Sequence, residues 1–288
     1  MRSKKGRSGC SRRFTALAMF AAVVSLSMLA GASAALAKTE PNPEFLPFVN
    51  CPIQNKAVRA CLVSTVTSGE FALGNKTVPI TKPITLQGGL EEGSTELIPP
   101  SNGETLSKTP LPVPGGLVGL ELGGPTEVTA TTELAGPVQV DESKLATGNG
   151  VAVTLPIKVK LDNPVLGSEC YVGSAASPIV LHLTTGTTSP PAPNKPITGK
   201  PGTLTVNPEL TIFTISGISL VDNSFSAPVA SGCGGALSAV VDEAVNLQVG
   251  LPAEAGHNTA VLTGTTEETF AKPLKKSKVI KKPKKTKG

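Results

Sequence analysis

Four cysteines carry the clearest covalent chemistry in this sequence: Cys51, Cys61, Cys170 and Cys233. An even number of cysteines in an exported chain predicts disulfides. Three pairings are possible. We favour Cys51–Cys61 with Cys170–Cys233, because the first two are close and flank a turn-like stretch beginning at Pro52. A zinc site is the alternative, but the sequence has no C-x-x-C spacing and its two histidines stand apart.

The last 17 residues, 272–288, hold nine lysines and no acid. The candidate polyanion-binding residues are Lys272, Lys275, Lys276, Lys278, Lys281, Lys282, Lys284, Lys285 and Lys287. Like charges at this density repel and Pro273 and Pro283 break helices, so we predict a disordered lysine-rich tail. Such a tail attracts anionic wall polymer, anionic lipid or extracellular DNA by counterion release. It has no arginine and no aromatic residue, so we expect no sequence-specific nucleic acid binding.

The formal net charge of +5 conceals an uneven distribution along the chain. Residues 38–271 hold 11 basic and 21 acidic residues, which makes this body −10. The tail could therefore fold back on the acidic body, or act only as a solubilising segment. The chain has no Trp, one Tyr and two His, which excludes a histidine-rich metal cluster and a row of base-stacking aromatics.

No catalytic constellation is visible in the sequence. Nucleophilic hydrolysis needs a nucleophile, a base and an orienting acid, but no G-x-S-x-G occurs after residue 37 and neither His182 nor His257 lies in a motif. Acidic pairs such as Glu267-Glu268 form no acid/base dyad by adjacency, because neighbouring strand residues point to opposite faces. We expect a noncatalytic protein without cofactor or metal.

The first 37 residues have the three-part pattern of a secretory signal peptide. Residues 2–13 are basic, 14–30 are apolar, and 31–37 are small and end in an A-x-A cleavage site. We expect cleavage near Ala37, which removes Cys10 and yields a secreted or cell-surface protein. The apolar segment is also long enough to span a bilayer, so an uncleaved anchor is the alternative.

Residues 38–271 are expected to form one mainly β domain. In 151–161, alternate residues from Val151 to Leu161 are apolar, and Pro156 on the polar face suggests an edge or a bulge. A hairpin is predicted over 71–80, turning at Gly74-Asn75. Further strands are predicted at 84–90, 117–122, 126–134, 179–185, 204–206, 210–221 and 258–266. The spacing predicts an antiparallel β-sandwich or barrel-like domain.

One segment departs from the β pattern. Apolar residues recur at spacings of three and four between Leu237 and Val245, which predicts a short amphipathic helix over 236–248. We interpret it as a plug for an open end of the sandwich, with a lid or partner site as the alternative. Pro-rich loops are predicted at 99–116 and 186–202. The second could link two domains, but a Cys170–Cys233 bridge across it favours one.

The stretch from Ser231 to Leu237, the stretch from Leu251 to Leu262 and the region from Cys51 to Leu90 resemble uncharacterised secreted proteins of high-GC actinobacteria. The resemblance implies an exported β-rich protein and transfers no activity or site residue.

The sequence favours a noncatalytic envelope or extracellular protein whose lysine-rich tail binds anionic surface polymers. The first alternative is a secreted β-sandwich binding module for an apolar or glycan ligand. Scarce aromatic residues count against glycans, because sugar faces usually stack on Trp or Tyr. A secreted hydrolase is the remaining alternative.

Overall fold

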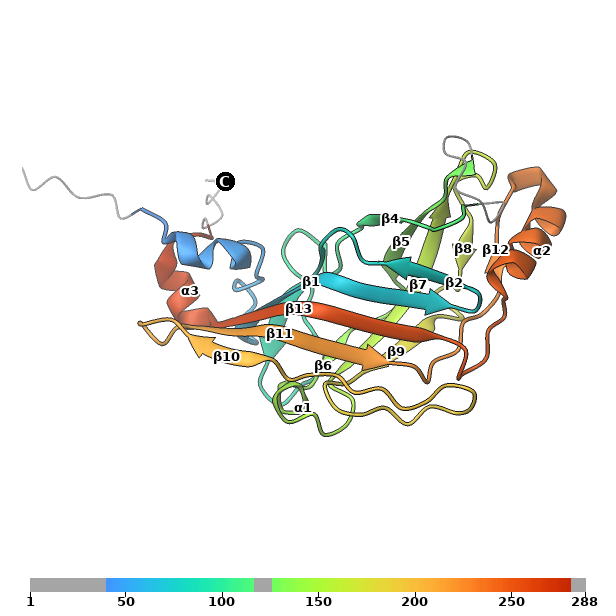
Figure 1. Cartoon of the computed structure of the whole chain (residues 1–288). Helices are drawn as coiled ribbons and strands as arrows, with labels where there is room; N and C mark the ends of the chain where they lie inside the picture. Colours follow the sequence, from blue (N-terminus) through green and yellow to red (C-terminus); the bar gives the residue numbers. More distant parts are fainter. Residues whose placement is uncertain (1–39, 117–125, 281–288) are drawn as a thin grey trace, which may run out of the picture. The chain divides into compact units, whose positions relative to one another are not determined.

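Two open antiparallel sheets pack face to face in this computed structural model (Figure 1). The structure describes residues 40–116 and 126–280, which belong to one compact unit. The predicted mainly β sandwich is confirmed, and the barrel alternative is wrong because neither sheet closes on itself. The predicted signal peptide, the predicted strand at 117–122 and the lysines from Lys281 onward lie outside the described residues.

The first sheet has six strands and is built around one long strand, β1. The main path runs β10-β11-β13-β1-β2, and β3 also pairs with β1. The predicted turn at Gly74-Asn75 joins β1 to β2, with Leu73 opposite Lys76. The strands are β1 (Val58–Leu73), β2 (Lys76–Pro79), β3 (Ile84–Glu91), β10 (Thr203–Val206), β11 (Ile212–Asp222) and β13 (Thr259–Phe270).

The second sheet has seven strands and is built around β7. The main path runs β12-β8-β7-β5-β4, and β6 and β9 also pair with β7. The strands are β4 (Pro110–Pro112), β5 (Thr129–Leu134), β6 (Gln139–Val140), β7 (Val153–Asp162), β8 (Tyr171–Val172), β9 (Ile179–Leu183) and β12 (Ala230–Ser231).

Strand β7 shows how the sequence pattern produces the main core. Its residues alternate between buried and half-buried, as the alternation in the sequence predicts. Pro156 does not mark an edge or a bulge, because it lies opposite Val180 inside this central strand. The Pro156 carbonyl accepts a hydrogen bond from Ala135, in the break between β5 and β6. A strand residue's N–H and C=O point the same way, so the missing N–H of Pro156 faces this break and forgoes only the reciprocal hydrogen bond to Ala135.

A second, smaller core lies on the other face of β1. Leu62 belongs to the main core, whereas its neighbours Cys61 and Val63 belong to the second core. Phe48 of the 3-10 helix η1 (Pro43–Phe48) and Leu274 of α3 (Ala271–Ser277) cover them. These two short helices lie side by side in Figure 1, and the Asn42 N–H donates to the Ser277 carbonyl at 3.1 Å.

Helix α3 corrects the prediction of disorder from Lys272 onward. The segment 272–280 is folded, and Leu274 is fully buried. Pro273 does not break the helix because it lies in the first turn, where the backbone N–H needs no partner within the helix. The helix was not predicted, because the high density of lysines indicates disorder more strongly than the spacing of Ala271 and Leu274 indicates a helix.

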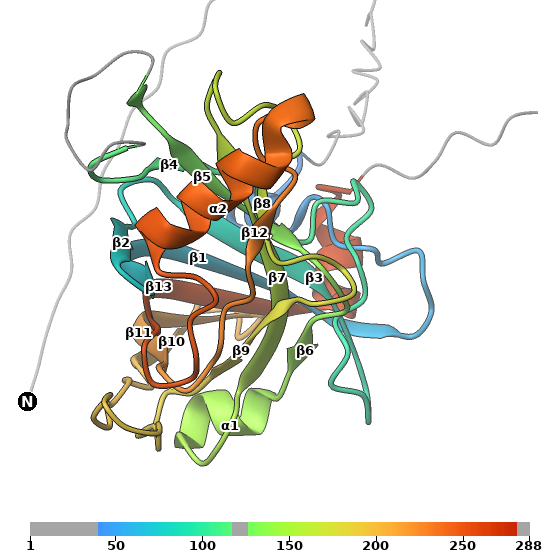
Figure 2. The same cartoon turned by 90° about the vertical axis from the view of Figure 1, so that its right-hand side faces the viewer.

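Two further helices lie at the margins of the sandwich. Helix α1 (Glu142–Thr147) follows β6 and buries Leu145 in the main core. Helix α2 (Ser238–Val249), preceded by η3 (Gly235–Leu237), confirms the predicted helix and crosses one end of the sandwich (Figure 2). Its orientation differs from the prediction, because Leu237 and Val240 are exposed. Asn246 bonds instead to strand β12, and Asp242 to the two residues just after that strand.

Candidate functional site

An apolar cavity of about 130 Å³ lies between the two sheets. Inner-face side chains of both sheets form its walls, because alternate strand residues point inward. Leu, Val and Ile dominate the lining, for example Leu62, Val66, Leu262, Leu155, Ile157 and Val159. The facing layers therefore leave unfilled apolar space.

Two polar side chains in the cavity wall, those of Ser64 and Thr266, do not require a polar ligand. Ser64 on β1 lies opposite Thr266 on β13, and their hydroxyl oxygens are 2.9 Å apart. The two hydroxyls satisfy each other, so an apolar occupant leaves neither unpaired. This part of the wall can contact a hydrocarbon without an uncompensated polar group.

A second space of about 250 Å³ lies between helix α2 and the end of the sandwich. Val241, Val245 and Val249 line it from the helix, four residues apart and hence on one helical face. Lys76, Val113, Leu161 and Val249 line both spaces. The two spaces are therefore neighbours that share a wall at the α2 end of the sandwich.

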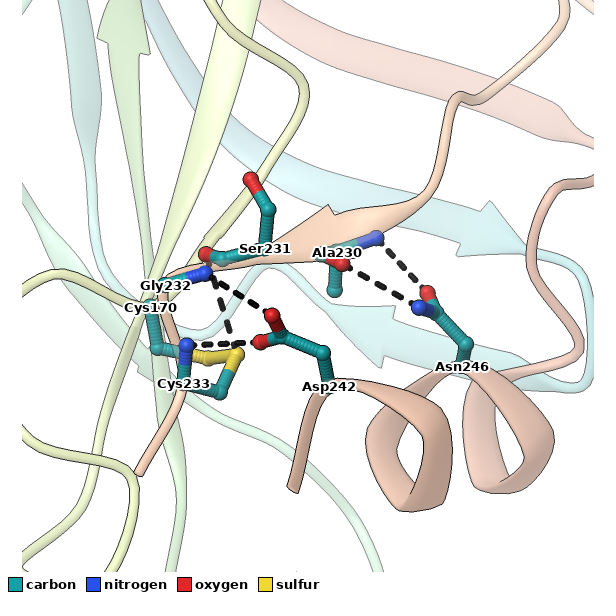
Figure 3. The surroundings of a disulfide bond; sticks show 7 residues. All are labelled: Cys170, Ala230, Ser231, Gly232, Cys233, Asp242 and Asn246. Carbon is teal, nitrogen blue, oxygen red and sulfur yellow. Dashed lines mark hydrogen bonds between the residues drawn. A yellow bond between two sulfur atoms is a disulfide. The ribbon is translucent and has the colours of Figure 1, made fainter. Parts of the chain in front are cut away.

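Helix α2 is fixed to the second sheet by side chains and a disulfide (Figure 3). The Asp242 carboxylate accepts hydrogen bonds from the N–H of Cys233 at 2.7 Å and of Gly232 at 3.3 Å. The Asn246 amide accepts from the Ala230 N–H at 2.7 Å and donates to the Ala230 carbonyl at 3.1 Å. These contacts hold the helix over the second space.

The C-terminal end of α2 is bound to the first sheet. The Asn75 N–H, in the turn before Lys76, donates to the Val249 carbonyl at 2.7 Å. Gly250 ends the helix in the left-handed region with φ of 78°. Because α2 is hydrogen-bonded to both sheets, it is held in place over this end of the sandwich.

A cluster of three charged side chains lies at the cavity margin beside α1. Arg59 forms ion pairs with Glu142 and, at 3.6 Å, with Glu268. Burial, together with the neighbouring Glu142 carboxylate, raises the pKa of Glu268 to about 7, while Arg59 acts in the opposite direction. Leu62, opposite Glu268 in the sheet, lines the cavity. The cluster joins α1 to the first sheet.

The structure brings the predicted cysteines together in the favoured pairing. Cys51–Cys61 has a Cα–Cα distance of 5.9 Å and Cys170–Cys233 one of 4.1 Å. Both pairings are confirmed, and neither pair was available for a zinc site. The first disulfide lies in the second core, and the second anchors the lead-in to α2.

The predicted polyanion-binding lysines are only partly described. Lys272, Lys275, Lys276 and Lys278 are exposed on and beside α3, and in the described part of the chain none of them forms an ion pair. The other five lie outside the described residues. Lysine binding to a polyanion stays a prediction.

Both histidine side chains are exposed, and among the described residues neither belongs to a catalytic group of side chains. His182 lies on β9, and only its backbone N–H contacts the buried Asp222 carboxylate, at 2.7 Å. His257 lies in the turn before β13. Within 40–116 and 126–280, no group of three or more His, Cys, Asp or Glu is arranged to hold a metal ion.

Sequence reasoning did not identify Lys76, Arg59 or Glu142 as site residues. Arg59 and Glu142 lie in no recognisable motif and are 83 positions apart, and nothing in the sequence around Lys76 indicates ligand binding. No described helix is long and apolar enough to cross a bilayer.

No protein-family model, curated protein or solved structure matches this chain.

Proposed function

We propose that this chain is an exported, noncatalytic binding protein that holds an apolar ligand between its two sheets. The apolar cavity with its adjoining space under α2 carries the proposal. Export is supported by the signal-peptide pattern of residues 1–37 and by two disulfides, which fit an oxidising compartment.

The size of the two spaces matches a small ligand. A dry apolar cavity of about 150 Å³ in another protein accepts benzene, so the 130 Å³ space between the sheets suits a short hydrocarbon segment. The adjoining 250 Å³ extends the volume toward that of ordinary ligand sites, about 300–1,000 Å³. The sparse polar lining and the lack of Trp favour an apolar ligand over a glycan.

The expected affinity follows from the apolar area buried. Each buried methylene contributes about 0.8 kcal/mol, so eight methylenes contribute about 6 kcal/mol. This gain alone corresponds to a Kd of order tens of micromolar, which is the tightest binding expected because the loss of translational and rotational freedom opposes it. Calorimetric titration of the purified, oxidised protein with decanol measures it.

A variant that fills the cavity provides the control. Ala130 lines the cavity, and Ala130→Phe is expected to abolish decanol binding. Ala176, exposed in the turn before β9, provides Ala176→Phe as the matched variant that should bind as the native protein does. Absence of saturable binding to the native protein, or equal binding by both variants, contradicts the proposal.

The lysine-rich C-terminal segment supports a second function, attachment to an anionic surface polymer. The supporting observation is that α3 buries Leu274 and Ser277 while its lysines remain exposed. A folded anchor thus leads directly into the remaining lysines of the tail. The attached ligand-binding domain would then work at the cell surface.

Charge substitution tests attachment without removing α3. A variant with glutamine in place of the four exposed lysines of the 272–280 segment should elute from an anionic matrix at lower salt. The matched control makes the same change at Lys56, Lys82, Lys195 and Lys200, which are exposed elsewhere. Equal elution of both variants contradicts attachment through this segment.

A further inference from the structure

Lys76 is the single charged side chain among the described residues that line the intersheet cavity, and also among those that line the space under α2. It is half-buried at the start of β2, directly after the Gly74-Asn75 turn. It therefore lies where the two apolar spaces share a wall.

The Lys76 ammonium has little compensation in the described structure. Its hydrogen bond goes to the Pro114 carbonyl at the long distance of 3.5 Å. No ion pair with a described carboxylate involves Lys76. This contact is exposed to solvent, so water meets the remaining donors of the ammonium, and an anion is the group that replaces that water best.

We infer that the ligand is a single-chain amphiphile whose anionic head binds Lys76 and whose hydrocarbon chain enters the space between the sheets. The inference rests on the proposed function and adds the chemical class and orientation of the ligand. The chain would pass the shared wall at Val113 and Leu161 and reach the inner face of β7. The flexible Lys76 stem packs along the apolar wall and leaves the ammonium at its edge.

The dimensions limit the ligand to one chain of moderate length. A cavity of about 130 Å³ holds a group of roughly benzene size and cannot hold two acyl chains side by side. The space under α2 can receive the rest of the chain near the head group. A carboxylate and a phosphate monoester share the required chemistry, a compact anion on one alkyl chain.

The test compares ligands with one chain length and different heads. Decanoate, decyl phosphate and decanol are titrated into the oxidised protein at neutral pH. A hydrogen bond to a charged group predicts at least tenfold tighter binding of an anionic ligand than of decanol. The tighter of the two anions identifies the head group.

Substitutions at Lys76 assign the preference to this side chain. Lys76→Met keeps much of the apolar stem and should bring the anion and decanol to equal affinity. Lys76→Arg keeps the charge and should retain most of the preference. Lys82→Met, at an exposed lysine six residues away, should bind as the native protein does.

The outcomes separate this inference from the proposed function. Equal affinity of the native protein for anions and decanol overturns the inference and leaves an apolar binding site intact. A preference that survives in Lys76→Met also overturns it. If no ligand binds the native protein, the proposed function fails and the inference fails with it.

Discussion

Glu268 offers a quantitative test of the charged cluster that joins α1 to the first sheet. Its side chain is 25% exposed and shares Arg59 with Glu142. Burial is the main cause that raises its pKa from 4.5 to about 7, and the neighbouring Glu142 carboxylate adds to it. Glu268→Gln replaces the carboxyl by a neutral group of the same shape.

The sign of the effect follows from the direction of this pKa shift. The native state holds the Glu268 proton more tightly than the unfolded chain does, so ionisation of Glu268 costs stability as pH rises from about 4.5 to 7. The difference between a pKa of 4.5 and one of about 7 corresponds to about 3 kcal/mol. Because the side chain is partly exposed, we expect Glu268→Gln to be about 2–3 kcal/mol more stable than the native protein at pH 8. Near pH 4, the two should be equally stable.

Urea unfolding at pH 4, 6 and 8 measures this difference. Glu92→Gln, at an exposed position after β3, is the matched control and should change stability little at any of these pH values. The reasoning is refuted if the difference between Glu268→Gln and the native protein does not grow from pH 4 to 8. It is also refuted if the variant is less stable at pH 8.

Three further variants test the framework around the site. Asn258 is fully buried; it accepts from the Gly74 N–H and donates to the carbonyls of Phe225, Ala253 and Glu254, so Asn258→Ala should lower the free energy of unfolding by about 1–3 kcal/mol. Leu274→Ala should cost about 2–5 kcal/mol in urea unfolding, and a change below 0.5 kcal/mol, about that of an exposed substitution, would show that α3 is not packed. Replacing Cys170 and Cys233 by serine opens a 63-residue loop and should cost about 4 kcal/mol in a thermal or urea melt, whereas an unchanged midpoint would contradict the pairing.

Local patterns predicted those parts of the fold where one face of a strand is buried. In β7 and β9, apolar residues alternate with exposed or half-buried ones, and the predicted inward faces are correct. The first part of β1 escaped prediction because residues near Cys61 are buried on both faces, by the main core and by η1 with α3. Burial on both faces removes the alternation that marks a strand. The short strands β6, β8 and β12 are too brief to show any period.

The candidate site depends on contacts that a single sequence does not display. The cavity arises from how the inner faces of two sheets meet, which no local pattern specifies. Helix α2 was predicted, but its apolar spacing predicted the wrong face toward solvent. Asp242 and Asn246 point toward the sandwich, because they find backbone partners on and beside β12. Lys76 becomes a candidate ligand-binding residue only because no other charged side chain among the described residues lines the two spaces.

Methyl-resolved NMR of the protein with bound decanoate tests the central claim, ligand binding between the sheets, most directly. We predict intermolecular nuclear Overhauser effects from the alkyl chain to cavity-lining methyl groups of both sheets, including Leu62, Leu262 and Val159. These effects should saturate at one ligand per protein. Contacts confined to exposed residues, such as Leu204 on β10 or Leu247 on α2, would contradict the claim.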